Sequence, residues 1–95
     1  MSNQLDFQPQ RTVVEPGQTV QWKNSSLLVH TVTAVPHLAA RAEHVAVPDG
    51  GEPFNSGNME PDDTFRHTFE VPGTYRYFCI PHEGAGMVGE VVVEE

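Results

Sequence analysis

A thiol, an imidazole and a thioether lie close together near the end of this sequence, in the segment YRYFCIPHEGAGM at 75–87. Cys79 is the only cysteine of the chain, His82 follows it by three positions, and Met87 follows His82 by five. Glycines between the last two allow the backbone to fold tightly around a small group. Thiolate, imidazole and thioether are ligands for soft or borderline transition metals, so this spacing predicts a metal site.

A fourth ligand has to come from elsewhere in the chain. His30 precedes the alternating run TVTAV at 31–35, where the end of a strand can meet Cys79. The candidate ligands are then His30, Cys79, His82 and Met87. Two imidazoles and a thiolate in a trigonal plane, with a weak axial thioether, are typical of a type 1 copper site for electron transfer. The sequence therefore predicts one copper ion per chain.

Other metals fit this set of ligands less well. Structural zinc sites normally use about four cysteine or histidine ligands, and an iron–sulfur cluster needs about four thiolates. A dinuclear copper centre needs a second cysteine. Taken one at a time, Cys79, His82 and Met87 each have an ordinary structural interpretation, as a buried thiol, a turn residue and a core gap-filler. Their combined spacing favours the copper site.

The elements that must position these ligands are strands. Short runs rich in valine, threonine and aromatic residues alternate with turn signals, which is typical of an antiparallel sandwich or barrel. The chain of 95 residues is too short for two independent cores, so we expect a single domain over 1–95.

Strand alternation predicts which side chains share a face. In the runs 19–24, 64–69 and 74–79, one face carries Val20, Trp22, Phe65, His67, Phe69, Tyr75, Tyr77 and Cys79. Phe78 is predicted to point outward, to the surface. Met87 has the parity of Gly89, Val91 and Val93 in the last run, GEVVV at 89–93, so Cys79 and Met87 bracket a loop between two neighbouring strands.

The segment 36–58 is the least strand-like part of the chain, and we expect a long excursion there with little sheet. Within it, HLAARAEHV at 37–45 permits a short helix, because Leu38, Ala42 and Val45 would lie on one side.

Three further histidines and one asparagine have ordinary structural interpretations. His37 and His44 are predicted to be solvated loop residues rather than an accessory metal site, and His67 to be a packed or rim histidine. Asn24 fits a glycosylation acceptor pattern in NSS, but we expect it to form a plain turn.

Charge and hydropathy exclude several classes of protein. Thirteen acidic and five basic residues give a formal net charge of −8, whereas nucleic acids and anionic lipids require a basic face. No stretch approaches the roughly 18 apolar residues of a membrane span, and the polar start at 1–10 does not resemble a signal peptide. The protein is therefore either cytoplasmic or has a leader or an anchor outside this sequence.

Two segments resemble the cupredoxins, the small blue-copper proteins, and within them the plastocyanin and halocyanin type. FCIPHEGAGMVGEVVV at 78–93 is similar to the metal loop and last strand of that family. EPGQTVQWKNSSLLVHTVTA at 15–34 is similar to its second strand and first-histidine segment. The resemblance covers residues 1–35 and 54–95.

The resemblance implies a fold and a function. The fold would be a Greek-key sandwich of about eight strands, in which the long loop has room for a short helix. His30, Cys79 and His82 would be the equatorial copper ligands and Met87 the axial ligand. The protein would be an electron carrier, not an enzyme, and would work outside the cytoplasm, in a periplasm, at the outer face of the cell membrane or in an equivalent lumen.

Two positions depart from the family pattern. Thr31 replaces the usual asparagine that braces the cysteine loop through its side chain, although the N–H of Thr31 is still expected to reach the sulfur. Phe78 replaces an exposed tyrosine that contacts a cytochrome partner. Both changes concern groups that tune the site or its docking.

The family also implies where electrons enter and leave. Its second histidine approaches the surface through an apolar patch, which here would comprise Leu5, Leu27, Leu28, Pro81 and Ala85 around His82. The partners would be redox proteins such as a cytochrome or a membrane oxidoreductase complex. We expect a monomer that does not bind nucleic acid, with any membrane tether outside this sequence.

Rival functions remain at this point. The chain is alternatively a copper-binding domain of a larger copper enzyme or respiratory complex. A copper-delivery chaperone would cluster its methionines, which lie at 1, 59 and 87. A copper-free interaction domain has no reason to combine these ligand types, and a cysteine–histidine hydrolase would need an orienting acid.

Overall fold

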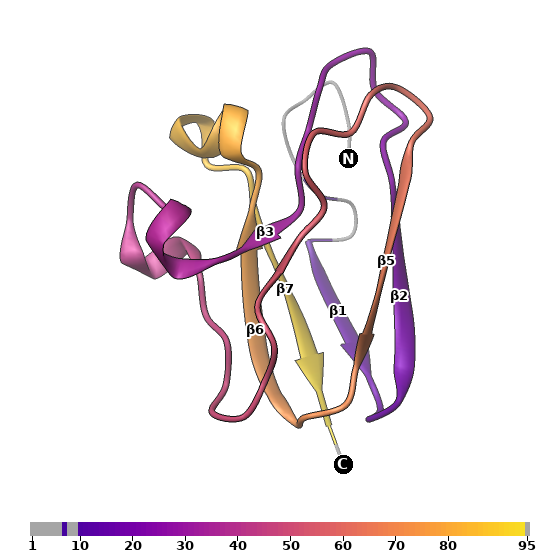
Figure 1. Ribbon diagram of the computed structural model, residues 1–95, viewed down its shortest axis with the longest axis vertical. Helices are drawn as coiled ribbons and strands as arrows, with labels where there is room; N and C mark the ends of the chain where they lie inside the picture. Colours follow the sequence, from indigo (N-terminus) through magenta and orange to yellow (C-terminus); the bar gives the residue numbers. More distant parts are fainter. Residues whose placement is uncertain (1–6, 8–9, 95) are drawn as a thin grey trace.

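The computed structural model describes Phe7 and residues 10–94. The protein is built from strands. Within these residues seven strands form two sheets (Figure 1). The larger sheet has the order β1 (Arg11–Val14), β7 (Val88–Val93), β6 (Gly73–Phe78), β3 (Thr33–Ala34) and β4 (Phe54–Asn55). The smaller sheet pairs β2 (Gln18–Lys23) with β5 (Thr64–Phe69). The all-β class predicted from the turn spacing is confirmed.

The core lies between the two sheets, and its centre is aromatic. Trp22 of β2 is buried, with its ring centroid 5.4 Å from Tyr77 and 5.6 Å from Phe65. Phe54 and Phe69 pack against the same indole at 5.9 and 6.2 Å. The predicted alternation holds, because the inward residues of β2, β5 and β6 are buried or half-buried and Gln21 and Lys23 are exposed.

The β6–β7 pair places the metal loop, and its register is fixed by close packing. Tyr77 lies opposite Gly89 in the antiparallel ladder. A Cβ on Gly89 would come within 2.7 Å of the Tyr77 ring, so only glycine fits there. Beyond the ladder, the N–H of Cys79 donates to the carbonyl of Met87 at 3.1 Å. Cys79 and Met87 thus bracket the loop between neighbouring strands, as predicted.

Phe78 is fully buried, so the prediction that it faces the surface is wrong. Its side chain does lie on the opposite face from Cys79, outside the main core cluster. The segment that follows β3 returns to this part of β6, where Ala46 and Arg76 exchange backbone hydrogen bonds of 3.0 and 2.8 Å. The Arg76 guanidinium also donates to the carbonyl of Glu43 at 3.1 Å. The excursion therefore covers the face that strand parity alone assigned to solvent.

The excursion contains two short 3₁₀ turns, η1 (Pro36–Leu38) and η2 (Ala42–His44), in place of the single helix permitted over 37–45. Ala39, between them, is extended at φ −82° and ψ 137°, and Arg41 is extended at φ −127° and ψ 130°. The expectation of little sheet is confirmed, since the pairing within 36–58 comprises the two residues of β4 and the single bridge at Ala46. Among the described residues, no helix is long and apolar enough to cross a membrane.

Candidate metal centre

Three of the four predicted ligands converge at one end of the sandwich. His30, Cys79 and His82 each present a ligand atom, and these atoms all lie within 4.8 Å of one another. Nδ1 of His30 and Nδ1 of His82 are each 3.5 Å from Sγ of Cys79. Cys79 and His82 come from one loop, whereas His30 lies 49 positions earlier, so the fold brings the histidine to the loop.

His30 is fully buried and is held through its backbone. Its N–H donates to the carbonyl of Met59 at 3.2 Å, and the N–H of Met59 donates back at 2.8 Å. This isolated bridge lies outside β3, so His30 does not lead a regular strand as the sequence indicated. The bridge nevertheless fixes the imidazole at the end of the sandwich.

Asn24 stabilises the chain around His30, a role that the sequence did not reveal. The asparagine is fully buried, and its amide donates to the carbonyls of Leu28 at 2.7 Å and Met59 at 2.9 Å. Its carbonyl oxygen accepts from the hydroxyl of Ser26 at 2.7 Å. The predicted turn at NSS is therefore present, and the buried amide is not a surface acceptor for a glycan.

Cys79 follows β6 and its sulfur is fully buried. Burial raises the pKa of the Cys79 thiol, and hydrogen bonds from the backbone of Thr31 and His82 and from the Thr31 side chain oppose part of that rise. The N–H of Thr31 donates to Sγ at 3.4 Å, as expected. A metal ion binding here has to displace the thiol proton.

The Thr31 side chain supplies the brace that the family usually obtains from asparagine. Its Oγ1 accepts the N–H of Ile80, the residue after the cysteine, at 2.8 Å. Thr33 Oγ1 lies 2.9 Å from Thr31 Oγ1 and 3.0 Å from Oδ1 of Asn55. A chain of hydroxyl groups thus connects the cysteine loop to β4. The loop is therefore anchored although position 31 is threonine instead of asparagine.

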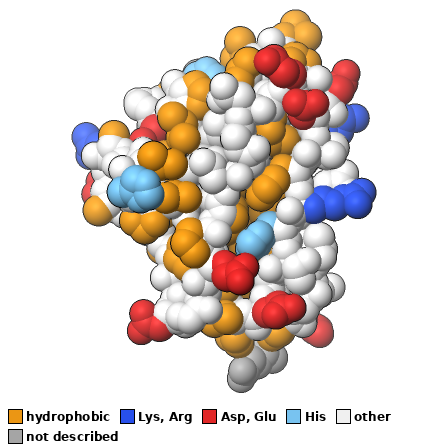
Figure 2. Space-filling view, viewed as in Figure 1, with side chains coloured by type: hydrophobic (Ala, Val, Ile, Leu, Met, Phe, Trp, Pro, Cys, Tyr) orange, Lys and Arg blue, Asp and Glu red, His pale blue; other side chains and the backbone are white. Residues whose placement is uncertain are grey.

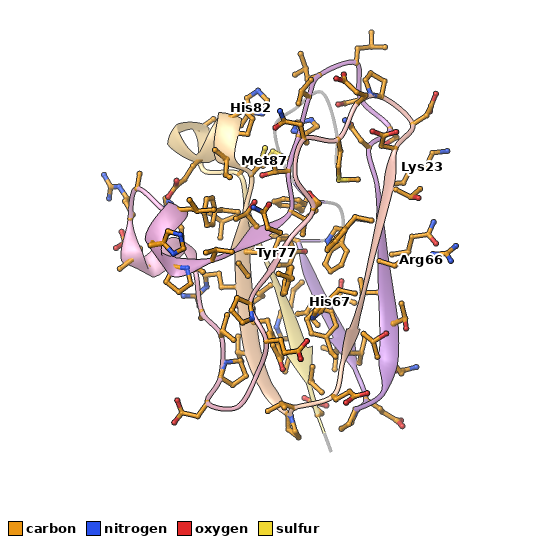
Figure 3. All side chains as sticks on the ribbon, in the orientation of Figure 1. Lys23, Arg66, His67, Tyr77, His82 and Met87 are labelled. Carbon is orange, nitrogen blue, oxygen red and sulfur yellow. The ribbon has the colours of Figure 1, made fainter. Side chains whose placement is uncertain are left out.

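Of the remaining predicted ligands, His82 lies in the 3₁₀ segment η3 (Ile80–Ala85), and Met87 follows Gly86, which ends that segment. The N–H of His82 donates to the carbonyl of Cys79 at 3.2 Å, and the segment kinks at His82 with φ −122° and ψ 18°. Gly86 ends it in the left-handed conformation at φ 81°, which glycine adopts without strain. Met87 is fully buried, whereas His82 is half-buried at the same end of the molecule (Figure 3).

The donor atoms fit copper. Two imidazole nitrogens and one thiol sulfur converge without a carboxylate among them, which favours a soft or borderline ion. Over Phe7 and residues 10–94, this is the one group of three or more histidine, cysteine, aspartate or glutamate side chains close enough to share a metal ion.

Comparison with known proteins supports the same metal. Residues 1–94 match the family of copper-binding proteins described as plastocyanin/azurin. The chain belongs to this family. It is 38% identical over 93 residues to a chloroplastic plastocyanin of Oryza sativa subsp. indica, covering 94% of this chain and 55% of that protein. It is 34% identical to a plastocyanin of Scenedesmus fuscus, covering 98% of this chain and 91% of the other.

Solved structures of the family share the fold. A pseudoazurin from Sinorhizobium meliloti superposes with a TM-score of 0.74 at 26% identity, covering all of this chain and 62% of that one. An oxidised amicyanin mutant gives a TM-score of 0.72 at 28% identity, covering 95% and 74%. The predicted cupredoxin sandwich is therefore confirmed. The chain spans just over half the length of some curated plastocyanins that it matches, such as the rice protein at 55%.

The other histidines lie outside the cluster. His37 is exposed, and His44 contacts Glu83 through Nδ1 at 2.8 Å. His67 packs between Phe54 and Phe69, with ring centroids 4.6 and 4.8 Å away, as expected for a packed or rim histidine. Glu83 was not singled out from the sequence, although an acidic residue directly after a predicted ligand was the signal available.

Proposed function

We propose that this chain is a small electron-transfer protein that carries one electron on a single type 1 copper. The proposed ligands are His30, Cys79, His82 and Met87. The observation that supports this most directly is the convergence of Sγ and two Nδ1 atoms, each nitrogen 3.5 Å from the sulfur, in a member of a copper-binding family. A copper ion held there supplies one-electron chemistry by alternating between Cu(I) and Cu(II).

The protein contributes a site that changes little during the reaction. Both ligands attached to the core, His30 and Cys79, are fully buried and fixed by backbone hydrogen bonds. A rigid, water-excluding arrangement keeps reorganisation small when an electron arrives or leaves. Met87 is fully buried after the same loop, which supports a thioether ligand that tunes the potential.

His82 is the proposed port for the electron. Its imidazole is half-buried, in contrast to the fully buried His30. Exposed apolar side chains occupy the same end of the molecule, at Leu27, Leu28, Ile80, Pro81 and Ala85. Figure 2 shows hydrophobic side chains gathered at the top of the view, near a histidine. Leu5, also expected in this patch, lies outside the described residues.

The apolar end also indicates the kind of partner. Leu27 is 83% exposed, so a partner that covers it would gain by removing apolar surface from water while approaching His82. We propose redox proteins as partners, such as a cytochrome or a membrane oxidoreductase complex. We further propose a monomeric single domain over 1–95, of the plastocyanin or halocyanin type, working in a periplasm, at an outer membrane face or in a lumen.

Voltammetry of the copper-loaded protein tests the function. The expected result is one reversible wave with one electron transferred per chain, and no catalytic current with oxygen or with small alcohols. An irreversible wave, or turnover of such a substrate, would contradict the assignment as a carrier.

A further inference from the structure

Glu83 is not one of the proposed copper ligands, yet its buried carboxylate accepts several hydrogen bonds. It follows His82 directly in η3 and is 7% exposed. Its oxygens accept the N–H of Ala40 at 2.9 and 3.0 Å and the N–H of Arg41 at 3.1 Å. Nδ1 of His44 lies 2.8 Å from Oε2. Burial alone would raise the pKa of Glu83, but these hydrogen bonds outweigh it and hold the pKa below its usual value.

These contacts join two segments that are far apart in sequence. Residues 36–46 of the excursion meet the segment η3 at this carboxylate. The hollow around it is lined by Ala40, Arg41, His44, Glu83 and Gly84. All the hydrogen bonds that the described residues form between the two segments end on Glu83. The same bonds explain why the excursion breaks into two 3₁₀ turns, because the N–H groups at 40 and 41 point to the carboxylate instead of to helical carbonyls.

We propose that Glu83 is a positioning residue for the ligand His82. Its carboxylate clamps the main chain at 82–83 against the excursion, so that the half-buried imidazole keeps one orientation toward Cys79. Hydrogen bonds to a charged acceptor are about twice as strong as neutral ones, and two adjacent backbone donors restrict where the carboxylate can lie. The inference rests on the proposed copper site, since it assigns to His82 the role of a ligand.

A change of charge has to be separated from a change of position. Glu83→Gln weakens the clamp, because an amide keeps only one acceptor oxygen, but it also removes a negative charge beside the ligand loop and would shift a reduction potential for that reason alone. Ala40→Pro removes one N–H donor of the clamp and leaves the charge in place. Ala39 has the extended conformation that a residue before proline requires, at φ −82° and ψ 137°.

The matched control is Glu43→Gln, which makes the same chemical change on the same excursion. The Glu43 side chain is 67% exposed and contacts Arg41 rather than the ligand loop. Its variant should therefore behave like the wild type in every measurement below.

Three measurements test the proposal. In the metal-free protein, they are the rate of amide hydrogen exchange at Arg41 and the NMR resonances of the His82 ring. In the protein loaded with Cu(II), it is the reduction potential. We expect Ala40→Pro and Glu83→Gln to speed exchange at Arg41 by roughly tenfold. Both should also shift the His82 ring resonances and the potential, while Glu43→Gln should not.

Two outcomes would overturn the clamp. If only Glu83→Gln moves the potential, Glu83 acts through its charge. If exchange accelerates while the His82 resonances and the potential stay at wild-type values, the contact is merely structural. A wild-type protein that binds no copper would contradict the proposed function instead, and the clamp would still be judged on the metal-free resonances of His82.

Discussion

The backbone N–H of Thr31 donates to Sγ of Cys79 at 3.4 Å, across 48 positions of sequence. The hydroxyl of the same threonine accepts the N–H of Ile80 at 2.8 Å. One residue beside His30 therefore contacts both the sulfur and the main chain that follows it. This double contact fixes the segment that carries His30 relative to the loop that carries Cys79.

Thr31→Val should destabilise the protein by about 1–3 kcal/mol, because the shape is kept while the partly buried N–H of Ile80 loses its acceptor. Urea denaturation of the metal-free protein measures this change. Thr33→Val is the matched control, since it removes a neighbouring hydroxyl and leaves the Thr31–Ile80 bond, and it should have the smaller effect. Equal urea midpoints for the Thr31 variant and the wild type would show that the Thr31–Ile80 hydrogen bond contributes nothing to the free energy of unfolding.

Leu28→Glu should slow electron self-exchange between copies of the copper-loaded protein by roughly tenfold or more. Leu28 is 39% exposed at the end that carries His82, so two chains that meet there would oppose like charges. Line broadening in mixtures of oxidised and reduced protein measures the rate. Thr74→Glu adds the same charge at an exposed position at the other end of β6 and should change the rate much less. Equal slowing by both variants would refute the port.

Met87→Gln should lower the reduction potential, because an amide oxygen is a harder ligand than a thioether and favours Cu(II). It should also cost about 1–3 kcal/mol in the metal-free protein, since the amide enters a fully buried position. Met87→Leu keeps the volume and should cost less than about 1.5 kcal/mol, with a potential above that of the wild type. The opposite order of the two potentials would argue against Met87 as the axial ligand.

His67 should make stability depend on pH near neutrality. Desolvation lowers the pKa of His67 in the folded state, and the charge of Glu52 opposes part of that shift. Glu70 and Tyr75 line the same pocket. Because the unfolded chain binds the proton more tightly, the contribution is complete above the usual pKa of about 6.5 and is lost as the pH falls through the folded value.

His67→Phe should therefore reduce the difference between unfolding free energies measured at pH of about 8 and about 5.5. His37→Gln, at an exposed histidine, serves as the control and should retain the wild-type difference. A His67 variant with unchanged pH dependence would show that this imidazole titrates alike in both states.

The site was largely predictable because strands have a period of two. That period places Cys79 inward after β6 and gives Met87 the parity of the buried residues of β7, and both side chains are fully buried in the structure. The types and spacing of the ligands indicated copper before any geometry was known. His30 could be selected as the fourth ligand because it precedes the run 31–35, where the end of a strand can meet Cys79.

What the sequence did not reveal depends on contacts between distant segments. Phe78 has the outward parity that was predicted, but the excursion returns to β6 and covers it. The short helix allowed by the pattern at 37–45 is broken because Glu83 takes the N–H groups of Ala40 and Arg41. The brace from Thr31 likewise depends on where Ile80 lies, which no local pattern shows.

In the proposed site, Cys79 binds copper as a thiolate together with two imidazoles. Its most direct test is the visible spectrum after one equivalent of Cu(II) is added to the folded protein, compared with Cys79→Ser. We expect an intense blue charge-transfer band that ascorbate bleaches and reoxidation restores, and no such band in the folded serine variant. A folded wild-type protein without that band, or a serine variant that retains it, would show that Cys79 is not a copper ligand.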